Sequence, residues 1–135
     1  MFSIHHISLS VKDIGDSVEF YKRLGFKKVS QWDSENNSLT IVHMKLNDCF
    51  LEFFCFTDNQ EAPESMKSLE TDLPRVGIKH FGLKVDSIGR AKEFVLSHNL
   101  SDAVSIKRGR TGIDYFFIKD PSGNFIEFVQ DEREM

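Results

Sequence analysis

Two histidines and two glutamates recur at nearly equal spacing in the two halves of this 135-residue chain. His6 and His80 each open a His-x-x-Leu-x-Val segment and lie 74 positions apart (80 − 6). Glu52 and Glu127 each stand in a Phe-x-Glu-Phe segment and lie 75 positions apart (127 − 52). Imidazole and carboxylate groups together bind divalent ions such as Ni²⁺, Co²⁺, Mn²⁺, Fe²⁺ or Zn²⁺. The repeated set therefore predicts a metal site built by duplication, and it leaves the identity of the ion open.

The apolar surroundings of these four residues strengthen the prediction. Side chains alternate along a strand, so His6 shares a face with Ser8 and Ser10, and His5 is expected on the opposite face. Glu52 shares a face with phenylalanines. A carboxylate among phenylalanines is costly unless it is paired or coordinated, and two neighbouring carboxylates repel each other. A divalent cation would remove both penalties.

Elements of the same type follow in the same order in the two halves. The first half is expected to contain a strand, a helix with Asp13 as N-cap and Gly25 after its end, and three more strands. The expected ranges are 3–11, 13–24, 26–32, 39–45 and 49–56 in the first half, and 80–85, 87–98, 104–108, 113–119 and 124–130 in the second. Each half therefore reads β-α-β-β-β.

A polar, turn-rich segment separates the two halves. Residues 57–77 contain two of the three prolines and the stretch Thr-Asp-Asn-Gln-Glu-Ala-Pro-Glu, with a short helix expected over 65–71. The chain is therefore divided into a first module over 1–56, a linker over 57–77 and a second module over 78–135. The matching order, spacing and ligands indicate an internal duplication.

Composition and cysteine usage exclude several classes of partner. The 17 basic and 21 acidic residues give a net charge of −4, and no basic cluster argues for nucleic acid. No apolar run approaches the roughly 18 residues of a membrane span, and the N-terminus lacks the pattern of a signal peptide. Cys49 and Cys55 are expected on one strand about 20 Å apart, too far to form a disulfide. Free thiols indicate a reducing compartment, so a cytoplasmic location is expected.

With these features the sequence resembles the vicinal oxygen chelate superfamily, and within it glyoxalase I-like (lactoylglutathione lyase-like) proteins. The resemblance rests on the paired β-α-β-β-β order, on the two His-x-x-Leu-x-Val segments and on Asp-Pro-Ser-Gly-Asn-Phe-Ile-Glu-Phe over 120–128. It covers nearly the whole chain apart from 57–77. It implies an α+β fold in which two modules form a cupped mixed sheet around a divalent metal.

The resemblance also implies roles for the four repeated residues. In that family the ligands come from the first and last strands of each module, which here carry His6, Glu52, His80 and Glu127. Glu127 is the implied catalytic base, and Glu52 is a metal ligand or a partner acid. The implied activity is that of a metal-dependent lyase or isomerase. The implied substrate is the hemithioacetal of a 2-oxoaldehyde and a thiol, which would react through an enediolate.

The chain departs from glyoxalase I at two positions that help to hold glutathione. Ser10 and Phe56 stand where that family has an Arg and an Asn. The implied metal ligands are therefore retained, while two of the residues that bind glutathione in that family are absent. Basic residues of the second half could offer replacement contacts to an anion, and aromatic side chains could exclude water. The candidate substrate-binding residues are Ser10, Phe54, Phe56, Lys84, Arg108 and Arg110.

Other functions of the same fold remain open at this point. The first is a metal-dependent epimerase or isomerase of another small acyl or keto substrate. The second is a small-molecule binding or resistance protein without catalysis. The resemblance implies a homodimer, and 57–77 would permit either pairing of modules within one chain or a swapped dimer. In a swapped dimer each site would combine His6 and Glu52 of one subunit with His80 and Glu127 of the other.

Overall fold

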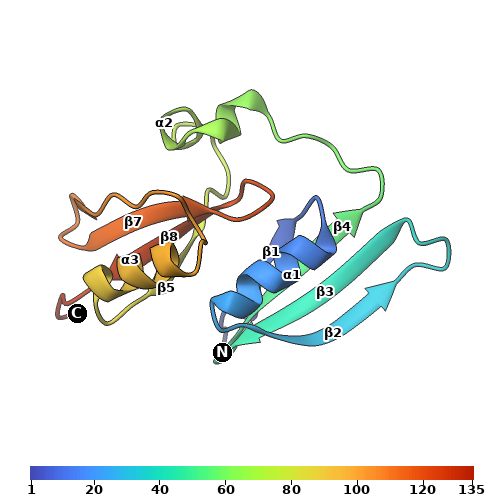
Figure 1. Cartoon of the computed structure of the whole chain (residues 1–135), viewed down its shortest axis with the longest axis horizontal. Coiled ribbons are helices and arrows are strands. Elements are labelled where there is room, and N and C mark those ends of the chain that lie inside the picture. The colour runs from blue at the N-terminus through green and yellow to red at the C-terminus, as the bar shows by residue number, and fades with distance from the viewer. The chain divides into compact units, whose positions relative to one another are not determined.

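The chain folds into two units that repeat the same architecture. The computed structural model describes residues 1–135, and the chain divides into Met1–Lys67 and Ser68–Met135. Each unit contains one four-stranded mixed sheet (Figure 1). The prediction of an α+β fold with two β-α-β-β-β modules is confirmed. None of the helices has both the length and the apolar character that a membrane crossing requires.

The first unit places its first and last strands side by side. Strand β1 is parallel to β4, and the other neighbours are antiparallel, in the order β1-β4-β3-β2. The elements are β1 (His6–Ser10), α1 (Ile14–Arg23), β2 (Lys27–Asp33), β3 (Leu39–Leu46), β4 (Cys49–Phe56) and the 3₁₀ turn η1 (Glu64–Lys67). This order brings the histidine of β1 beside the glutamate of β4.

The second unit repeats this topology. Strand β5 is parallel to β8, and the sheet order is β5-β8-β7-β6. The elements are α2 (Leu69–Asp72), β5 (Phe81–Lys84), α3 (Ile88–Ser97), β6 (Lys107–Arg108), β7 (Asp114–Lys119) and β8 (Phe125–Gln130). Strand β6 has only two residues, so it is much shorter than the strand expected over 104–108. The equal strand orders agree with the duplication inferred from the sequence.

One face of each sheet is buried under the helix of its unit. In the first unit α1 begins at the predicted cap, since the carboxylate of Asp13 accepts a hydrogen bond of 2.8 Å from the amide of Asp16. It ends before Gly25, whose positive φ of 101° suits a residue without Cβ. Tyr21 of α1 packs on Phe53 of β4 with ring centroids 5.2 Å apart, and both rings are fully buried. This packing leaves the opposite face of the sheet for the site.

The core of the second unit is built in the same way. Val95 of α3 is fully buried, as is Ile126 of β8. Phe116 of β7 and Phe128 of β8 stack with centroids 4.8 Å apart and planes 8° from parallel. Burying a large apolar side chain contributes about 1.5–3 kcal/mol, so these residues fix which face of each strand points inward. Their neighbours in the alternation, including Glu127, must then point to the other face.

The turn between β7 and β8 explains the Asp-Pro-Ser-Gly-Asn segment. Asp120 is 5% exposed, and its Oδ1 accepts hydrogen bonds of 2.9 Å from the amides of Ser122 and Asn124. Its Oδ2 accepts a further hydrogen bond of 3.0 Å from the side-chain amide of Asn124. These bonds fix the length of the turn and hence the register in which Glu127 pairs with Phe117. The Asp-Pro-Ser-Gly-Asn part of the resemblance is thus a turn that positions a glutamate.

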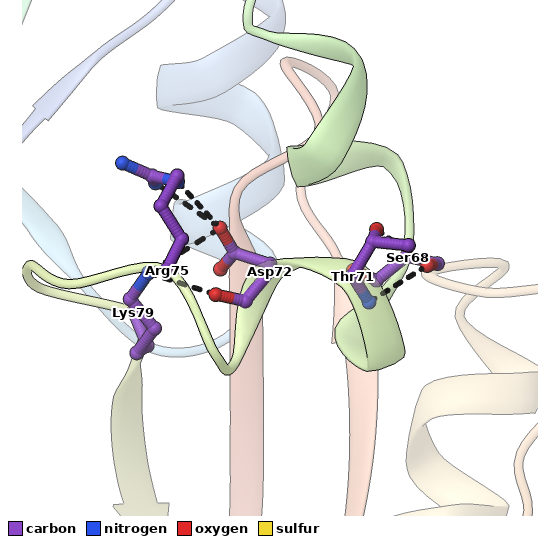
Figure 2. A network of polar contacts seen from close by, with 5 residues as sticks. All are labelled: Ser68, Thr71, Asp72, Arg75 and Lys79. Atoms are coloured by element: carbon purple, nitrogen blue, oxygen red, sulfur yellow. Dashed lines mark hydrogen bonds and ion pairs between the residues drawn. The ribbon is translucent and has the colours of Figure 1, made fainter.

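The segment before β5 is tied together by a buried carboxylate (Figure 2). Asp72 is 1% exposed, and its Oδ1 lies 3.1 Å from Nη2 of Arg75 and 3.4 Å from Nζ of Lys79. Burial raises the pKa of the Asp72 carboxyl, but the hydrogen bond from Arg75 and the charge of Lys79 outweigh it and hold the pKa below its usual value. Ser68 caps α2 by accepting from the amide of Thr71. Residues 68–79 are therefore an ordered part of the second unit.

Strand β2 forms an exposed edge of the first sheet. All seven of its residues are exposed, and its register against β3 shifts at a bulge between Lys28 and Ser30. Strand β1 begins at His6, three residues later than the expected start at residue 3.

Candidate metal centre

His6 and Glu52 come together on the open face of the first sheet. His6 is the first residue of β1, and Glu52 lies in the middle of the neighbouring strand β4. Nε2 of His6 is 3.6 Å from Oε1 of Glu52. This distance is too long for a hydrogen bond. It matches the roughly 3–3.6 Å that separates two ligands of one ion when each lies about 2.0–2.2 Å from it.

His80 and Glu127 form the corresponding pair in the second unit. His80 immediately precedes β5, and Glu127 lies on the neighbouring strand β8. Nε2 of His80 is 3.1 Å from Oε2 of Glu127. The rings of His80 and Phe117 are nearly perpendicular, with centroids 4.7 Å apart. Nδ1 of His80 is buried and has no hydrogen-bond partner.

A third histidine, His43, lies against Glu52 and was not among the sequence-based candidates. His43 on β3 pairs in register with Glu52, and its Nε2 lies 2.7 Å from Oε2 of that carboxylate. The two oxygens of Glu52 therefore face two different imidazoles. In the second unit the residue that pairs with Glu127 is Phe117, which cannot donate a hydrogen bond. The two halves thus repeat the His–Glu pair but differ in what supports it.

The donors present fit a divalent metal, although each unit supplies only part of a ligand set. Each unit contributes one imidazole nitrogen and one carboxylate from adjacent strands, and the four side chains are between 17% and 43% exposed. No group of three or more His, Cys, Asp or Glu side chains in the structure is arranged to hold a metal ion. Since metal sites of this donor type use three or four protein ligands, each pair is incomplete by itself.

The expectation that His5 points away from His6 is wrong. His5 precedes β1, so the alternation of side chains along the strand does not extend to it. Its ring stacks on Phe50 with centroids 5.0 Å apart, and its Nδ1 is 2.9 Å from Nδ1 of His6. His5 therefore packs beside the first histidine of the repeated set.

The candidate substrate-binding residues of the first unit share the face of Glu52. Ser10 pairs with Phe54 at the end of β1, and Phe54 is two residues from Glu52 on β4. Phe56 closes β4 and is 45% exposed. Trp32 on β2 pairs with Ile41 on the same face and is 55% exposed. Apolar side chains therefore flank the carboxylate on this face.

The basic candidates of the second unit do not lie together. Lys84 pairs with Val129 and shares the face of Glu127. Arg108 pairs with Asp114 on the opposite face and forms an ion pair of 3.1 Å with it. Arg110 lies in the exposed loop after β6. Lys107, which was not among the sequence-based candidates, pairs with Tyr115 and so lies on the face of Glu127 together with Lys84.

A pocket of about 540 Å³ opens in the second unit next to this face. Its lining includes the apolar residues Leu69, Leu100, Phe117, Ile118 and Phe125, and Asp102 and Lys119 contribute charges of opposite sign. His80 and Glu127 do not line it, but Phe117 borders the pocket and also contacts the ring of His80. The pocket is therefore next to the His–Glu pair and separate from it.

Comparisons with known proteins give the context of this geometry. Residues 3–128 match the family described as Glyoxalase/Bleomycin resistance protein/Dioxygenase superfamily. The YwbC protein of Bacillus subtilis strain 168 is 29% identical over 133 residues, which cover 94% of this chain and 96% of that protein. A glyoxalase family protein from Enterococcus faecalis has a similar structure, with a TM-score of 0.78 and 21% identity over 95% of this chain and 97% of that one. The trypanothione-dependent glyoxalase I of Leishmania major gives a TM-score of 0.68 and 20% identity over 96% of this chain and 87% of that one.

Proposed function

Because the chain belongs to the glyoxalase/bleomycin resistance protein/dioxygenase superfamily, we propose that it is a metal-dependent enzyme that rearranges a small substrate by proton transfer. The observation that carries the proposal is the repeated His–Glu pair, with His6 near Glu52 and His80 near Glu127. A duplicated scaffold requires conserved packing, but packing alone does not require an imidazole beside a carboxylate on the same two strands of each half.

The four residues of these pairs would hold one divalent ion together. Their donor types suit Ni²⁺, Co²⁺, Mn²⁺, Fe²⁺ or Zn²⁺. When bound, such an ion supplies Lewis acidity, which lowers the cost of negative charge on neighbouring substrate oxygens. All four side chains are only partly exposed, so a carboxylate here gains more from a cation than it would in bulk water.

Glu127 is the proposed general base. Its carboxylate would take a proton from one substrate carbon and return it to the adjacent carbon, while Glu52 remains a ligand or a partner acid. Phe117 on β7 is the cross-strand partner of Glu127 and offers it no hydrogen bond. The neighbouring strand therefore does not fix the position of this carboxylate. Phe54 and Phe56 would keep water away from the charged intermediate of the substrate.

The proposed substrate is the hemithioacetal of a 2-oxoaldehyde and a thiol, which is converted into a thioester. The structural similarity to a glyoxalase I supports this substrate class. Ser10 and Phe56 cannot supply the charged and amide contacts of the family to glutathione, so the natural thiol is expected to differ from it. Lys84 and Lys107 lie on the face of Glu127 and are the cations available to an anionic group of that thiol.

Two further functions compete with this proposal. The changes at Ser10 and Phe56 would equally suit an epimerase or isomerase of another small acyl or keto substrate, which would use the same carboxylate base. The superfamily also includes bleomycin resistance proteins, so small-molecule binding without turnover is the remaining candidate. Two free cysteines support a reducing compartment, and we infer a cytoplasmic homodimer.

The proposal is tested by adding methylglyoxal and glutathione to metal-stripped protein supplemented in turn with Ni²⁺, Co²⁺, Mn²⁺ and Zn²⁺. Thioester formation that depends on an added metal supports the proposed reaction and identifies the ion. The same assay with trypanothione and with small aminothiols tests the choice of thiol. Tight metal binding without thioester from any thiol would favour the epimerase or the binding protein. If no ion binds, the metal-dependent function is wrong.

A further inference from the structure

His43 contacts Glu52 of the first His–Glu pair, and Phe117 stands at the equivalent position of the second unit. We propose that His43 is a positioning residue that orients Glu52 toward the metal, an inference that rests on the proposed metal-dependent function. The carboxylate of Glu52 lies between two imidazoles, with Oε2 at 2.7 Å from Nε2 of His43 and Oε1 at 3.6 Å from Nε2 of His6. One oxygen is thus held by a hydrogen bond while the other remains directed at the candidate ligand.

The distances separate a supporting residue from a ligand. Two atoms that coordinate one ion at about 2.0–2.2 Å each lie roughly 3 Å or more apart, because a shorter separation would crowd them. The contact of 2.7 Å between His43 and Glu52 is a charge-assisted hydrogen bond instead. Such bonds from residues behind the ligands fix the orientation of a coordinating carboxylate.

The pairing of strands makes this contact part of the fold. His43 and Glu52 are direct partners in the antiparallel β3–β4 pair, so their Cβ atoms are close whatever the ligand state. Met44 on one side of His43 and Phe53 beside Glu52 are fully buried on the opposite face. The core packing of their neighbours therefore holds both side chains on the open face, where the hydrogen bond forms.

The second unit provides the comparison within the same chain. Phe117 occupies the position of His43, so Glu127 has no donor on the neighbouring strand β7. The one hydrogen-bond partner of Glu127 is His80, at 3.1 Å, and His80 is itself a candidate ligand. Glu52, which has a supporting donor besides its candidate ligand, is then suited to remain a ligand, and Glu127, which has none, is suited to move during proton transfer. His43 accordingly distinguishes the roles of two carboxylates that the duplication made equivalent.

The test measures Ni²⁺ affinity of the full-length, metal-stripped chain by titration calorimetry, without substrate. His43→Phe introduces the residue found at the equivalent position of the second unit. It should raise the dissociation constant for Ni²⁺ about 10- to 100-fold. His43→Gln places an amide donor at a similar reach and should restore affinity to within a few-fold of the original. His43→Asn is polar but shorter, and it should bind as weakly as His43→Phe. Lys45→Gln, on the same strand and face, is the matched control and should leave the affinity unchanged.

The outcomes separate this inference from the proposed function. Unchanged affinity in His43→Phe, or equal affinities in His43→Gln and His43→Asn, would overturn the positioning role while the metal site stands. If the original protein binds no Ni²⁺, Co²⁺, Mn²⁺ or Zn²⁺, the proposed function and this inference fail together. The Gln and Asn variants still decide the question if His43→Phe does not fold. The unfolding midpoints of the metal-free variants should lie within a few degrees of that of the original protein. The reason is that an isolated, partly exposed pair such as His43–Glu52 contributes little to stability.

Discussion

The glutamates at positions 52 and 127 occupy equivalent places in two sheets and have different neighbours. Glu52 accepts from His43 on the adjacent strand, whereas Glu127 is paired with the ring of Phe117. The one hydrogen-bond partner of Glu127 is His80, at 3.1 Å, which is itself a candidate metal ligand. A carboxylate without a further supporting donor can reorient at a lower cost, which suits a group that must approach a substrate proton. This difference supports the proposal that Glu127 is the base, in addition to the family resemblance.

Glu127→Gln is expected to lower the turnover number by about 10²- to 10⁴-fold, since an amide cannot act as a general base. The fold should persist, because glutamine is close to glutamate in size and the side chain lies on the open face of β8. Steady-state kinetics with the substrate identified by the assay and a thermal unfolding curve check both statements. Near-native turnover would show that another residue takes the proton.

Asp72→Asn is expected to destabilise the second unit at neutral pH. The pKa of Asp72 lies below its unfolded value of about 3.9, so its stabilising effect is present above that pH and is lost as the pH falls through the folded pKa. The unfolding midpoint of the variant should therefore lie below that of the original protein at pH 7, and the two should converge once the pH has fallen below the folded pKa of Asp72. Differential scanning calorimetry across this range checks the expectation.

A matched control for this measurement is available in the same short helix. Glu70 is exposed on α2, so Glu70→Gln should leave the unfolding midpoint unchanged at every pH. A difference between Asp72→Asn and the original protein that stayed constant from pH 7 to below the folded pKa of Asp72 would mean that the charge of Asp72 contributes nothing.

At the scale of elements, the β7–β8 turn is expected to be a sensitive point. Asp120→Ala would leave three buried or turn-bound donors of Ser122 and Asn124 without their acceptor. Each unsatisfied group costs about 1–3 kcal/mol when water cannot replace the bond, so we expect a loss of roughly 2–4 kcal/mol in the free energy of unfolding. Chemical denaturation measures it. Pro121→Ala at the exposed neighbouring position should cost far less, and equal losses would contradict the role of the Asp120 carboxylate.

Most of the elements could be predicted because they depend on local signals. The cap at Asp13, the glycine at Gly25 and the limits of β4 (Cys49–Phe56) all follow from neighbouring residues. Elements that depend on pairing were less accurate. Strand β6 shrinks to Lys107–Arg108 because only these residues find partners on β7, and the apolar pattern over 104–108 does not reveal this.

The repeated residues of the candidate site could be predicted from the sequence, but the residues that contact them could not all be predicted. His43 had no counterpart in the second half, so a search for repeats passed over it. The two-residue turn Asn47–Asp48 nevertheless defines a hairpin register that pairs His43 with Glu52, and this signal was available in the sequence. Arg108 was grouped with Lys84 by charge alone, and only the pairing with Asp114 reveals that it lies on the other face.

At the scale of the whole molecule, we expect one ion per chain that requires donors from both halves. His6→Ala and His80→Ala should therefore each abolish tight Ni²⁺ binding, because the two donors of one half are too few to hold an ion firmly. Metal analysis after gel filtration gives the stoichiometry. If each variant instead kept half of the bound metal, the two His–Glu pairs would be independent sites, and the joint centre would be refuted. The expectation is the same for intrachain and swapped pairing of the halves.

The bulge in β2 also affects how the molecule behaves in solution. Seven consecutive exposed residues at a sheet edge present free amides and carbonyls to any other extended chain, which is the usual starting point for aggregation. The irregular step between Lys28 and Ser30 interrupts the regular ladder, and the ammonium groups of Lys27 and Lys28 repel a second copy. The remaining edges, β1, β5 and β6, are short. The first sheet can therefore keep its partly apolar face open while its longest edge resists self-association into fibres.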